Sequence, residues 1–173
     1  MSILSQKTIA NKIVFNGVGL HTGNNVQLNL IPAAPNTGII FKRVDLLKNN
    51  IVLPTFENVS DTTLCTTISN NNGVKISTIE HLMGALYGIG IDNLIIEINS
   101  QELPILDGSA KVFVEKILST GIKSSSSPIK LIKINKKVSY SEGSKKISID
   151  QSKVASEIDF EIEYKNKIIQ TQR

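Results

Sequence analysis

The chain of 173 residues is poor in the residue types that cross-link chains or bind metals: it has one cysteine, two histidines and no tryptophan. A single cysteine excludes an internal disulfide framework, as expected in a reducing compartment. The same shortage leaves few candidate ligands for a catalytic zinc, which usually takes three protein ligands. Aromatic residues make up only 5% of the chain, so the core must consist mainly of Ile, Leu and Val.

Long apolar runs and strong charge are also lacking. No stretch approaches the roughly 20 apolar residues of a membrane span, and the N-terminus lacks the pattern of a secretory signal, so we expect a cytoplasmic protein without a transmembrane segment. The net charge is +4, and no basic stripe interleaved with aromatic residues suggests nucleic acid as a partner. The lysines between 130 and 146 indicate either solvated strand faces or attraction to an anionic partner, such as a phosphorylated substrate or a membrane surface.

The first part of the chain contains several strand patterns. Apolar and alternating residues predict strands over 7–15, 26–31, 39–44, 64–68 and 74–76. Between the first two lies Gly17-Val-Gly-Leu-His-Thr-Gly23, whose three glycines indicate a tight turn or a close backbone approach. This segment has the spacing of neither a phosphate-binding P-loop nor a dinucleotide fingerprint.

Two helices are predicted after these strands, with a strand over 92–98 between them. Ser77 opens the first helix, because Ser77 and Glu80 have capping-box spacing and Gly88 and Gly90 supply stop signals. Its predicted buried face consists of Ile79, Leu82, Met83 and Leu86. Ser109 opens the second helix, which Gly121 closes, and its predicted buried face consists of Val112, Phe113, Ile117 and Leu118.

The serine-rich segment 124–128 predicts a flexible linker that ends in a proline. It would separate an N-terminal domain, residues 1–123, from a second part, residues 129–173. The second part has strand patterns over 129–140, 145–150 and 157–164 but no helix, so we expect the truncated start of a domain. The order of elements predicts the α+β class, with a layer of helices on one face of a mostly antiparallel sheet.

Glu80 and His81 form the most informative pair in the sequence. A helix N-terminus favours the neutral imidazole that binds metals, and a carboxylate beside it suits a base for a metal-bound water. The alternative is that Glu80 only caps the helix and His81 is a surface residue. A single Glu-His pair does not decide between them.

Three further residues have both a structural and a functional interpretation. His21 is either a loop histidine without a partner or part of a loop that lines a cleft. Asp107, in Asp-Gly-Ser before a helix, is best explained by turn and cap chemistry. Cys65 has no activating neighbour in the sequence, which favours a buried structural thiol over a reactive one.

Five stretches in fixed order are together far more specific than any one of them: Gly17-Val-Gly-Leu-His-Thr-Gly23, Asp61-Thr-Thr-Leu-Cys-Thr66, Ile76-Ser-Thr-Ile-Glu-His-Leu-Met-Gly-Ala-Leu86, Gly90-Ile-Asp-Asn-Leu94 and Glu102-Leu-Pro-Ile-Leu-Asp-Gly-Ser-Ala110. The chain closely resembles the UDP-3-O-acyl-N-acetylglucosamine deacetylases, zinc hydrolases of the committed step in lipid A (lipopolysaccharide) biosynthesis. The resemblance is strong over 1–123 and weak over 129–164.

The resemblance implies two α+β domains of the ribosomal protein S5 domain 2-like type, the second of them incomplete here. It implies that His81 is a ligand of Zn²⁺ and that Glu80 is the general base that activates water. His21, Leu64 and Cys65 match stretches near the active site and are expected to contact substrate. Tyr164 lies in a segment similar to the family's nucleotide-contact region, so it is a candidate contact of the uridine.

The departures from the family pattern are equally informative. The family's remaining zinc ligands form a His-x-x-x-Asp pair in the second domain, and this chain has no such pair. One hypothesis is therefore an enzyme that is part of a complete deacetylase or needs a separately encoded C-terminal half. The other is a non-catalytic truncated or decayed fragment. We expect little or no turnover from these residues alone, and the number of zinc ligands separates the two hypotheses.

Overall fold

The computed structural model describes residues 4–152 and 157–173. The chain forms two compact units, Met1–Ile129 and Lys130–Arg173. Both α-helices found among the described residues, α1 (Glu80–Ile89) and α2 (Lys111–Thr120), belong to the first unit. Neither has the length and apolar character that crossing a bilayer requires.

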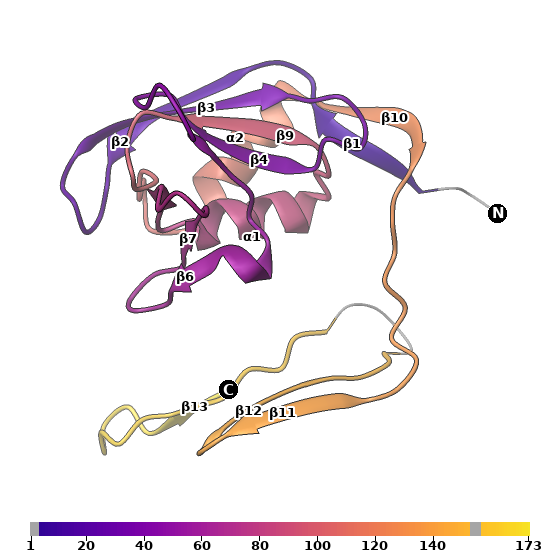
Figure 1. Cartoon of the computed structure of the whole chain (residues 1–173). Coiled ribbons are helices and arrows are strands. Elements are labelled where there is room, and N and C mark those ends of the chain that lie inside the picture. Colours follow the sequence, from indigo (N-terminus) through magenta and orange to yellow (C-terminus); the bar gives the residue numbers. More distant parts are fainter. Residues whose placement is uncertain (1–3, 153–156) are drawn as a thin grey trace. The chain divides into compact units, whose positions relative to one another are not determined.

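A five-stranded sheet forms the main layer of the first unit (Figure 1). Its order is β2-β3-β9-β4-β5. The bounds are β2 (Ile13–Val18), β3 (Asn25–Pro32), β9 (Leu94–Ile98), β4 (Ile39–Arg43) and β5 (Ile51–Val52). Strands β4 and β9 pair in parallel, whereas the other neighbours pair antiparallel. The mixed α and β content and the mostly antiparallel sheet confirm the α+β prediction.

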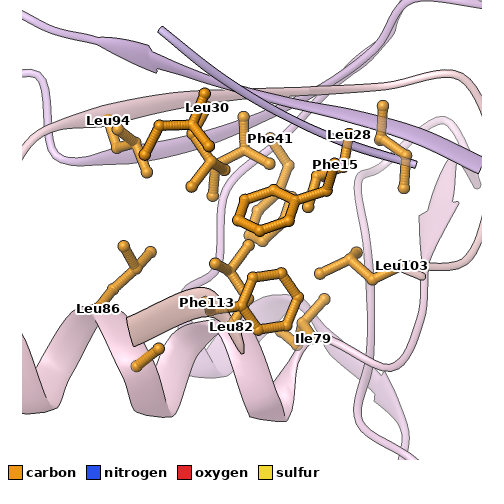
Figure 2. Close-up of a cluster of buried hydrophobic side chains, with 14 of the residues drawn as sticks. Phe15, Leu28, Leu30, Phe41, Ile79, Leu82, Leu86, Leu94, Leu103 and Phe113 are labelled. Carbon is orange, nitrogen blue, oxygen red and sulfur yellow. The ribbon is translucent and has the colours of Figure 1, made fainter. Parts of the chain in front are cut away.

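The helices cover one face of this sheet and enclose the core (Figures 1 and 2). Alternation along β3 turns Leu28 and Leu30 inward, where both are fully buried. Leu82 of α1 is fully buried in the same core cluster. Phe113 of α2 meets Phe15 of β2 edge to face, with ring centroids 5.0 Å apart. Phe41 is also fully buried, so three phenylalanines lie within an otherwise aliphatic core.

The prediction for the second helix was correct at its end and for two of the four residues of its buried face, but the helix begins at Lys111 instead of Ser109, and Val112 is only partly buried. Gly121 ends α2, and Phe113 and Ile117, four residues apart, are buried. Leu118 was expected to be buried but is 56% exposed. The next residue in a helix points about 100° further round, which directs Leu118 away from the face that Ile117 presents to the sheet.

The start of α1 differs from the prediction. The helix begins at Glu80, and the expected capping box with Ser77 does not form. Ser77 pairs instead with the segment after β9: its N–H and its Oγ both donate to Gln101 O, at 2.9 and 3.2 Å, and its carbonyl accepts from Leu103 N. Long-range pairing therefore takes the groups that a local cap would need.

The segment 124–128 is not a linker, so that prediction was wrong. It belongs to β10 (Ile122–Pro128), which pairs antiparallel with β1 (Ser5–Ile9). The predicted single strand over 7–15 is also two strands, since the chain leaves β1 and enters the other sheet at β2. Serine side chains do not prevent a strand when the backbone groups find partners on a neighbour.

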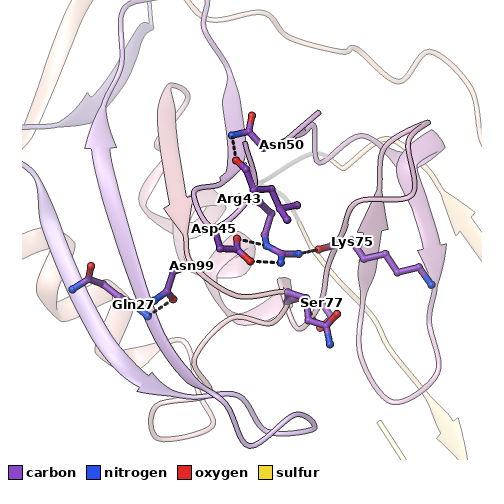
Figure 3. A network of polar contacts seen from close by, with 9 residues as sticks. Gln27, Arg43, Asp45, Asn50, Lys75, Ser77 and Asn99 are labelled. Carbon is purple, nitrogen blue, oxygen red and sulfur yellow. Dashed lines mark hydrogen bonds and ion pairs between the residues drawn. The ribbon is translucent and has the colours of Figure 1, made fainter. Parts of the chain in front are cut away.

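A smaller sheet of order β6-β7-β8 stands beside the main one. It consists of β6 (Val59–Asp61), β7 (Thr67–Ser69) and β8 (Lys75–Ile76), and a 3₁₀ turn, η1 (Phe56–Asn58), precedes it. Arg43 connects the two sheets, because its guanidinium donates to Lys75 O at 2.9 Å and is held by both carboxylate oxygens of Asp45 (Figure 3). The strand expected over 64–68 begins only at Thr67, which leaves 62–66 as a loop.

The second unit contains two hairpins among its described residues. Strands β11 (Val138–Glu142) and β12 (Lys145–Ile149) form the longer one, and β13 (Ile162–Glu163) and β14 (Thr171–Gln172) the shorter one. The predicted strand over 145–150 is confirmed, whereas those over 129–140 and 157–164 are much shorter than expected. Its strands are exposed throughout.

Candidate functional site

Glu80 and His81 occupy the first turn of α1, and both side chains are half-buried. Glu80 Oε2 accepts a hydrogen bond from Thr66 N at 3.1 Å. Among the described residues the second carboxylate oxygen of Glu80 and the imidazole of His81 have no hydrogen-bond partner. An oriented acid with one unpaired oxygen, next to an imidazole without a partner, can accept a proton from a bound water.

The loop of Leu64 and Cys65 lies directly beside Glu80, because Thr66, the donor to Glu80, is the next residue. Leu64 has a left-handed backbone (φ 62°) and is 86% exposed. Cys65 is half-buried, with its Sγ 3.7 Å from Thr67 Oγ1. The thiol expected to be buried is therefore only partly so. Sequence reasoning placed this loop near the site only through the family resemblance, and the structure brings it to Glu80.

His21 lies in the Gly17–Gly23 segment that connects β2 to β3. Its backbone N–H donates to Glu102 Oε1 at 2.9 Å, while the residue itself is exposed. The close approach predicted from the glycines is confirmed, because a Cβ added at Gly17 would lie 2.8 Å from Pro104 Cβ. The loop is thus fixed by its backbone and leaves the imidazole of His21 toward solvent.

Glu102 is the residue of this region that sequence reasoning missed. It is fully buried and accepts four hydrogen bonds, from His21 N, Thr22 N and the hydroxyls of Thr22 and Thr78, at 2.7–3.0 Å. Burial acts to raise the pKa of this carboxyl, but the hydrogen bonds outweigh burial and hold its pKa below the ordinary value. One acid in a motif carries no local sign of such an environment, so only the structure distinguishes it.

Asp107 performs the turn chemistry that the sequence predicted, whereas the N-cap residue of α2 is Ala110, without a side-chain cap. Its carboxylate accepts from the N–H and the hydroxyl of Ser109, and Ser109 Oγ in turn accepts from Lys111 N at the start of α2. Tyr164 belongs to the second unit, where its N–H donates to Gln170 O at 3.3 Å. Its contact with substrate stays a prediction.

A catalytic zinc needs more ligands than this region offers. Within residues 4–152 and 157–173, no group of three or more His, Cys, Asp or Glu side chains is placed to hold a metal ion. His81 offers one imidazole, and its neighbour Glu80 is engaged by Thr66. These residues therefore do not fit a complete zinc site by themselves.

The chain matches the family described as LpxC: UDP-3-O-acyl N-acetylglycosamine deacetylase over residues 6–173. It is 44% identical over 162 residues to a UDP-3-O-acyl-N-acetylglucosamine deacetylase of Pseudoalteromonas atlantica, which covers 92% of this chain and 53% of the relative. A deacetylase of the same name from Actinobacillus succinogenes is 48% identical over 143 residues, or 83% of this chain and 47% of the relative. The chain thus spans about half the length of the curated relatives it matches. On this evidence from sequence and motif order, the chain belongs to the UDP-3-O-acyl N-acetylglycosamine deacetylase family.

Proposed function

We propose that this chain contributes the general base Glu80 and one zinc ligand, His81, to the deacetylation of UDP-3-O-acyl-N-acetylglucosamine, the committed step of lipid A biosynthesis. Family membership supports the reaction class. The observation that carries the assignment of residues is the bond from Thr66 N to Glu80 Oε2, which fixes the acid beside His81 at the first turn of α1.

The proposed reaction is the hydrolysis of the acetamide on C2 of the sugar. The oxygen of a water forms a bond to the acetyl carbonyl carbon, the carbon–nitrogen bond breaks, and acetate and a free sugar amine result. Glu80 accepts a proton from the attacking water through the oxygen that Thr66 leaves unpaired. The same carboxyl can then return that proton to the departing nitrogen, which restores the base.

This activity needs zinc ligands beyond those that the chain supplies. A catalytic zinc usually takes three protein ligands, and His81 supplies one. The curated relatives are about twice as long as this chain. We therefore propose that the remaining ligands come from the other half of the enzyme, either in the same polypeptide or in a separately encoded C-terminal half.

A second candidate is a non-catalytic fragment that hydrolyses nothing. The observation in its favour is the same lack of a three-ligand group among the described residues. The two candidates differ in one property: a catalytic half gains zinc and turnover when the other half is added, and a decayed fragment does not.

Finer features of the proposal rest on the family resemblance. We propose the ribosomal protein S5 domain 2-like fold for the first unit and an unfinished domain of the same type for residues 129–173. His21, Leu64, Cys65 and Tyr164 are proposed substrate contacts. A cytoplasmic location is proposed on the same ground.

The test is to co-express the chain with a polypeptide that supplies the half of the Pseudoalteromonas atlantica deacetylase beyond the matched region. Zinc per mole and deacetylation are measured for the chain alone and for the assembly. We expect little zinc and no turnover from the chain alone, and both from the assembly.

Variants of the assembly then test each residue. Glu80→Gln should retain zinc and lose about a hundredfold or more of turnover. His81→Ala should lose zinc itself. Glu97→Gln is the matched control, because Glu97 pairs with Lys42 on the sheet at 3.2 Å and should change neither quantity. Full turnover in Glu80→Gln, or unchanged zinc affinity in His81→Ala, would remove the respective assignment.

A further inference from the structure

Glu102 is an acid whose burial requires an explanation. Its side chain is fully buried, and none of the ion pairs among the described residues includes it. Burying a carboxylate without a cation is costly unless hydrogen bonds replace its water. The donors that do so come from two segments, 21–22 in the loop between β2 and β3 and Thr78 in the turn before α1.

The two oxygens divide these donors evenly. Oε1 accepts from His21 N at 2.9 Å and from Thr78 Oγ1 at 3.0 Å. Oε2 accepts from Thr22 N at 2.8 Å and from Thr22 Oγ1 at 2.7 Å. One carboxylate therefore joins the loop that carries His21 to the segment that leads into Glu80 and His81.

Thr78, one of the residues that bond to Glu102, has a strained backbone. Its φ is 58°, in the left-handed region that a β-branched residue rarely adopts. Such conformations persist only where the surroundings impose them, and they are concentrated at functional sites. The hydroxyl of Thr78 bonds to Glu102, and Ser77 on its other side pairs with Gln101 and Leu103. The turn at Thr78 leads into α1, which begins two residues later at Glu80.

We propose that Glu102 is a positioning residue of the candidate site, whose buried carboxylate holds the His21 loop and the strained turn at Thr78 and thereby places Glu80 and His81. That Glu80 and His81 are the reacting pair rests on the proposed function. The positioning itself is a property of the chain and is measurable without substrate or metal.

Glutamine is a sharp probe of this arrangement. Each oxygen of Glu102 serves one backbone N–H, so an amide in either orientation turns its NH₂ donor toward the N–H of His21 or of Thr22. A hydroxyl can rotate to avoid such a conflict, but a backbone N–H cannot. Glu102→Gln, although almost identical in shape, should therefore break the connection.

The experiment is amide hydrogen exchange, followed by NMR, on four chains: wild type, Glu102→Gln, Thr78→Gly and the double variant. The amides of His21 and Thr22 report the loop, and Met83 N, which bonds to Ile79 O at 2.9 Å, reports the first turn of α1. Leu94 N, bonded to Gly38 O at 2.9 Å, is the control amide in the central sheet. Glu102→Gln should speed exchange at His21, Thr22 and Met83 by about tenfold to a hundredfold and leave Leu94 unchanged.

Thr78→Gly separates positioning from a merely structural role. Glycine adopts a left-handed φ without strain, so the first turn of α1 should no longer depend on Glu102. In this background Glu102→Gln should speed exchange only at His21 and Thr22, while Met83 keeps the rate of Thr78→Gly. Equal acceleration of all amides including Leu94, no acceleration at all, or acceleration of Met83 in both backgrounds would overturn the proposal.

A measurement on the wild type covers the case in which Glu102→Gln does not fold. The ¹³C signal of the Glu102 carboxyl should titrate below the ordinary range of glutamate, and titration above it would show a neutral acid and contradict the connection. Turnover enters none of these readouts. An assembly that keeps full turnover with Glu80→Gln and shows the expected exchange pattern would therefore refute only the assignment of Glu80 as the general base. An assembly that loses turnover with Glu80→Gln but lacks the expected exchange pattern would refute only the positioning by Glu102.

Discussion

In the first unit, β9 turns Leu94 and Ile96 toward the helices, and both are fully buried. In the second unit, the hairpin of β11 and β12 places Tyr140 opposite Ile147, and these side chains are 64% and 70% exposed. Apolar residues recur at every second position in all three strands: 94, 96 and 98 in β9, 138 and 140 in β11, and 147 and 149 in β12. The difference shows that a period-two pattern directs side chains to one face, whereas burial depends on a second layer packed against that face.

The second layer in the first unit is the pair α1 and α2, and the described residues of the second unit include no counterpart to it. A two-stranded hairpin alone is marginally stable in water. The proposed other half of the enzyme would therefore have a second role besides supplying zinc ligands. It would supply the layer that the apolar face of β11 and β12 requires.

The largest effect should come from the aromatic contact in the first core. Phe113→Ala should lower the free energy of unfolding by about 3–5 kcal/mol, because it leaves a cavity opposite Phe15. Phe160→Ala is the matched control in the second unit, since Phe160 is 68% exposed, and its effect should stay within about 0.5 kcal/mol. Urea denaturation of the two variants measures both. Similar losses in the free energy of unfolding for the two variants would mean that the first unit is not better packed than the second.

Two glycines of the first unit should respond with opposite sign. A Cβ at Gly19 would collide with Glu102 Oε2 and Thr22 Oγ1, so Gly19→Ala should cost about 1–3 kcal/mol. Gly84 lies in the middle of α1 with nothing within 4 Å of an added Cβ, so Gly84→Ala should stabilise by about 1 kcal/mol. Thermal unfolding of the two single variants decides the signs. A stable Gly19→Ala would contradict the tight packing around Glu102.

The sequence allowed much of the first unit to be predicted, because β3, β9 and the buried faces of α1 and α2 follow from periodicity. The adjacency of Glu80 and His81 is itself a sequence feature, and the turn at Asp107 follows from local chemistry. What could not be predicted depends on partners far away in the chain. Ser124 pairs with Lys7, and Ser77 bonds to Gln101, so neither segment adopts the structure that its local composition favours.

Acid should weaken the first unit in a way that depends on Glu102. Burial acts to raise the pKa of Glu102, but the hydrogen bonds from His21, Thr22 and Thr78 lower it by a larger amount. The folded-state pKa therefore lies below the ordinary value of 4.5. The contribution of Glu102 to stability is therefore complete above that ordinary value and is lost as the pH falls through the lower folded-state pKa. Urea denaturation of wild type and Glu102→Gln at a series of pH values tests this. The variant should show a flatter acid limb, and equal slopes would exclude the contribution.

The smallest effect should separate two ion pairs of equal geometry. Arg43 binds Asp45 in the first unit and Arg173 binds Asp159 in the second, each with a closest contact of 2.6 Å. Arg43 is mostly buried and also donates to Lys75 O, so Arg43→Lys should cost about 1–2 kcal/mol, because lysine cannot make all of these bonds at once. Arg173→Lys should leave the melting temperature unchanged, since water and salt screen an exposed pair. A larger shift for Arg173→Lys than for Arg43→Lys would show that burial does not govern the difference between the two units.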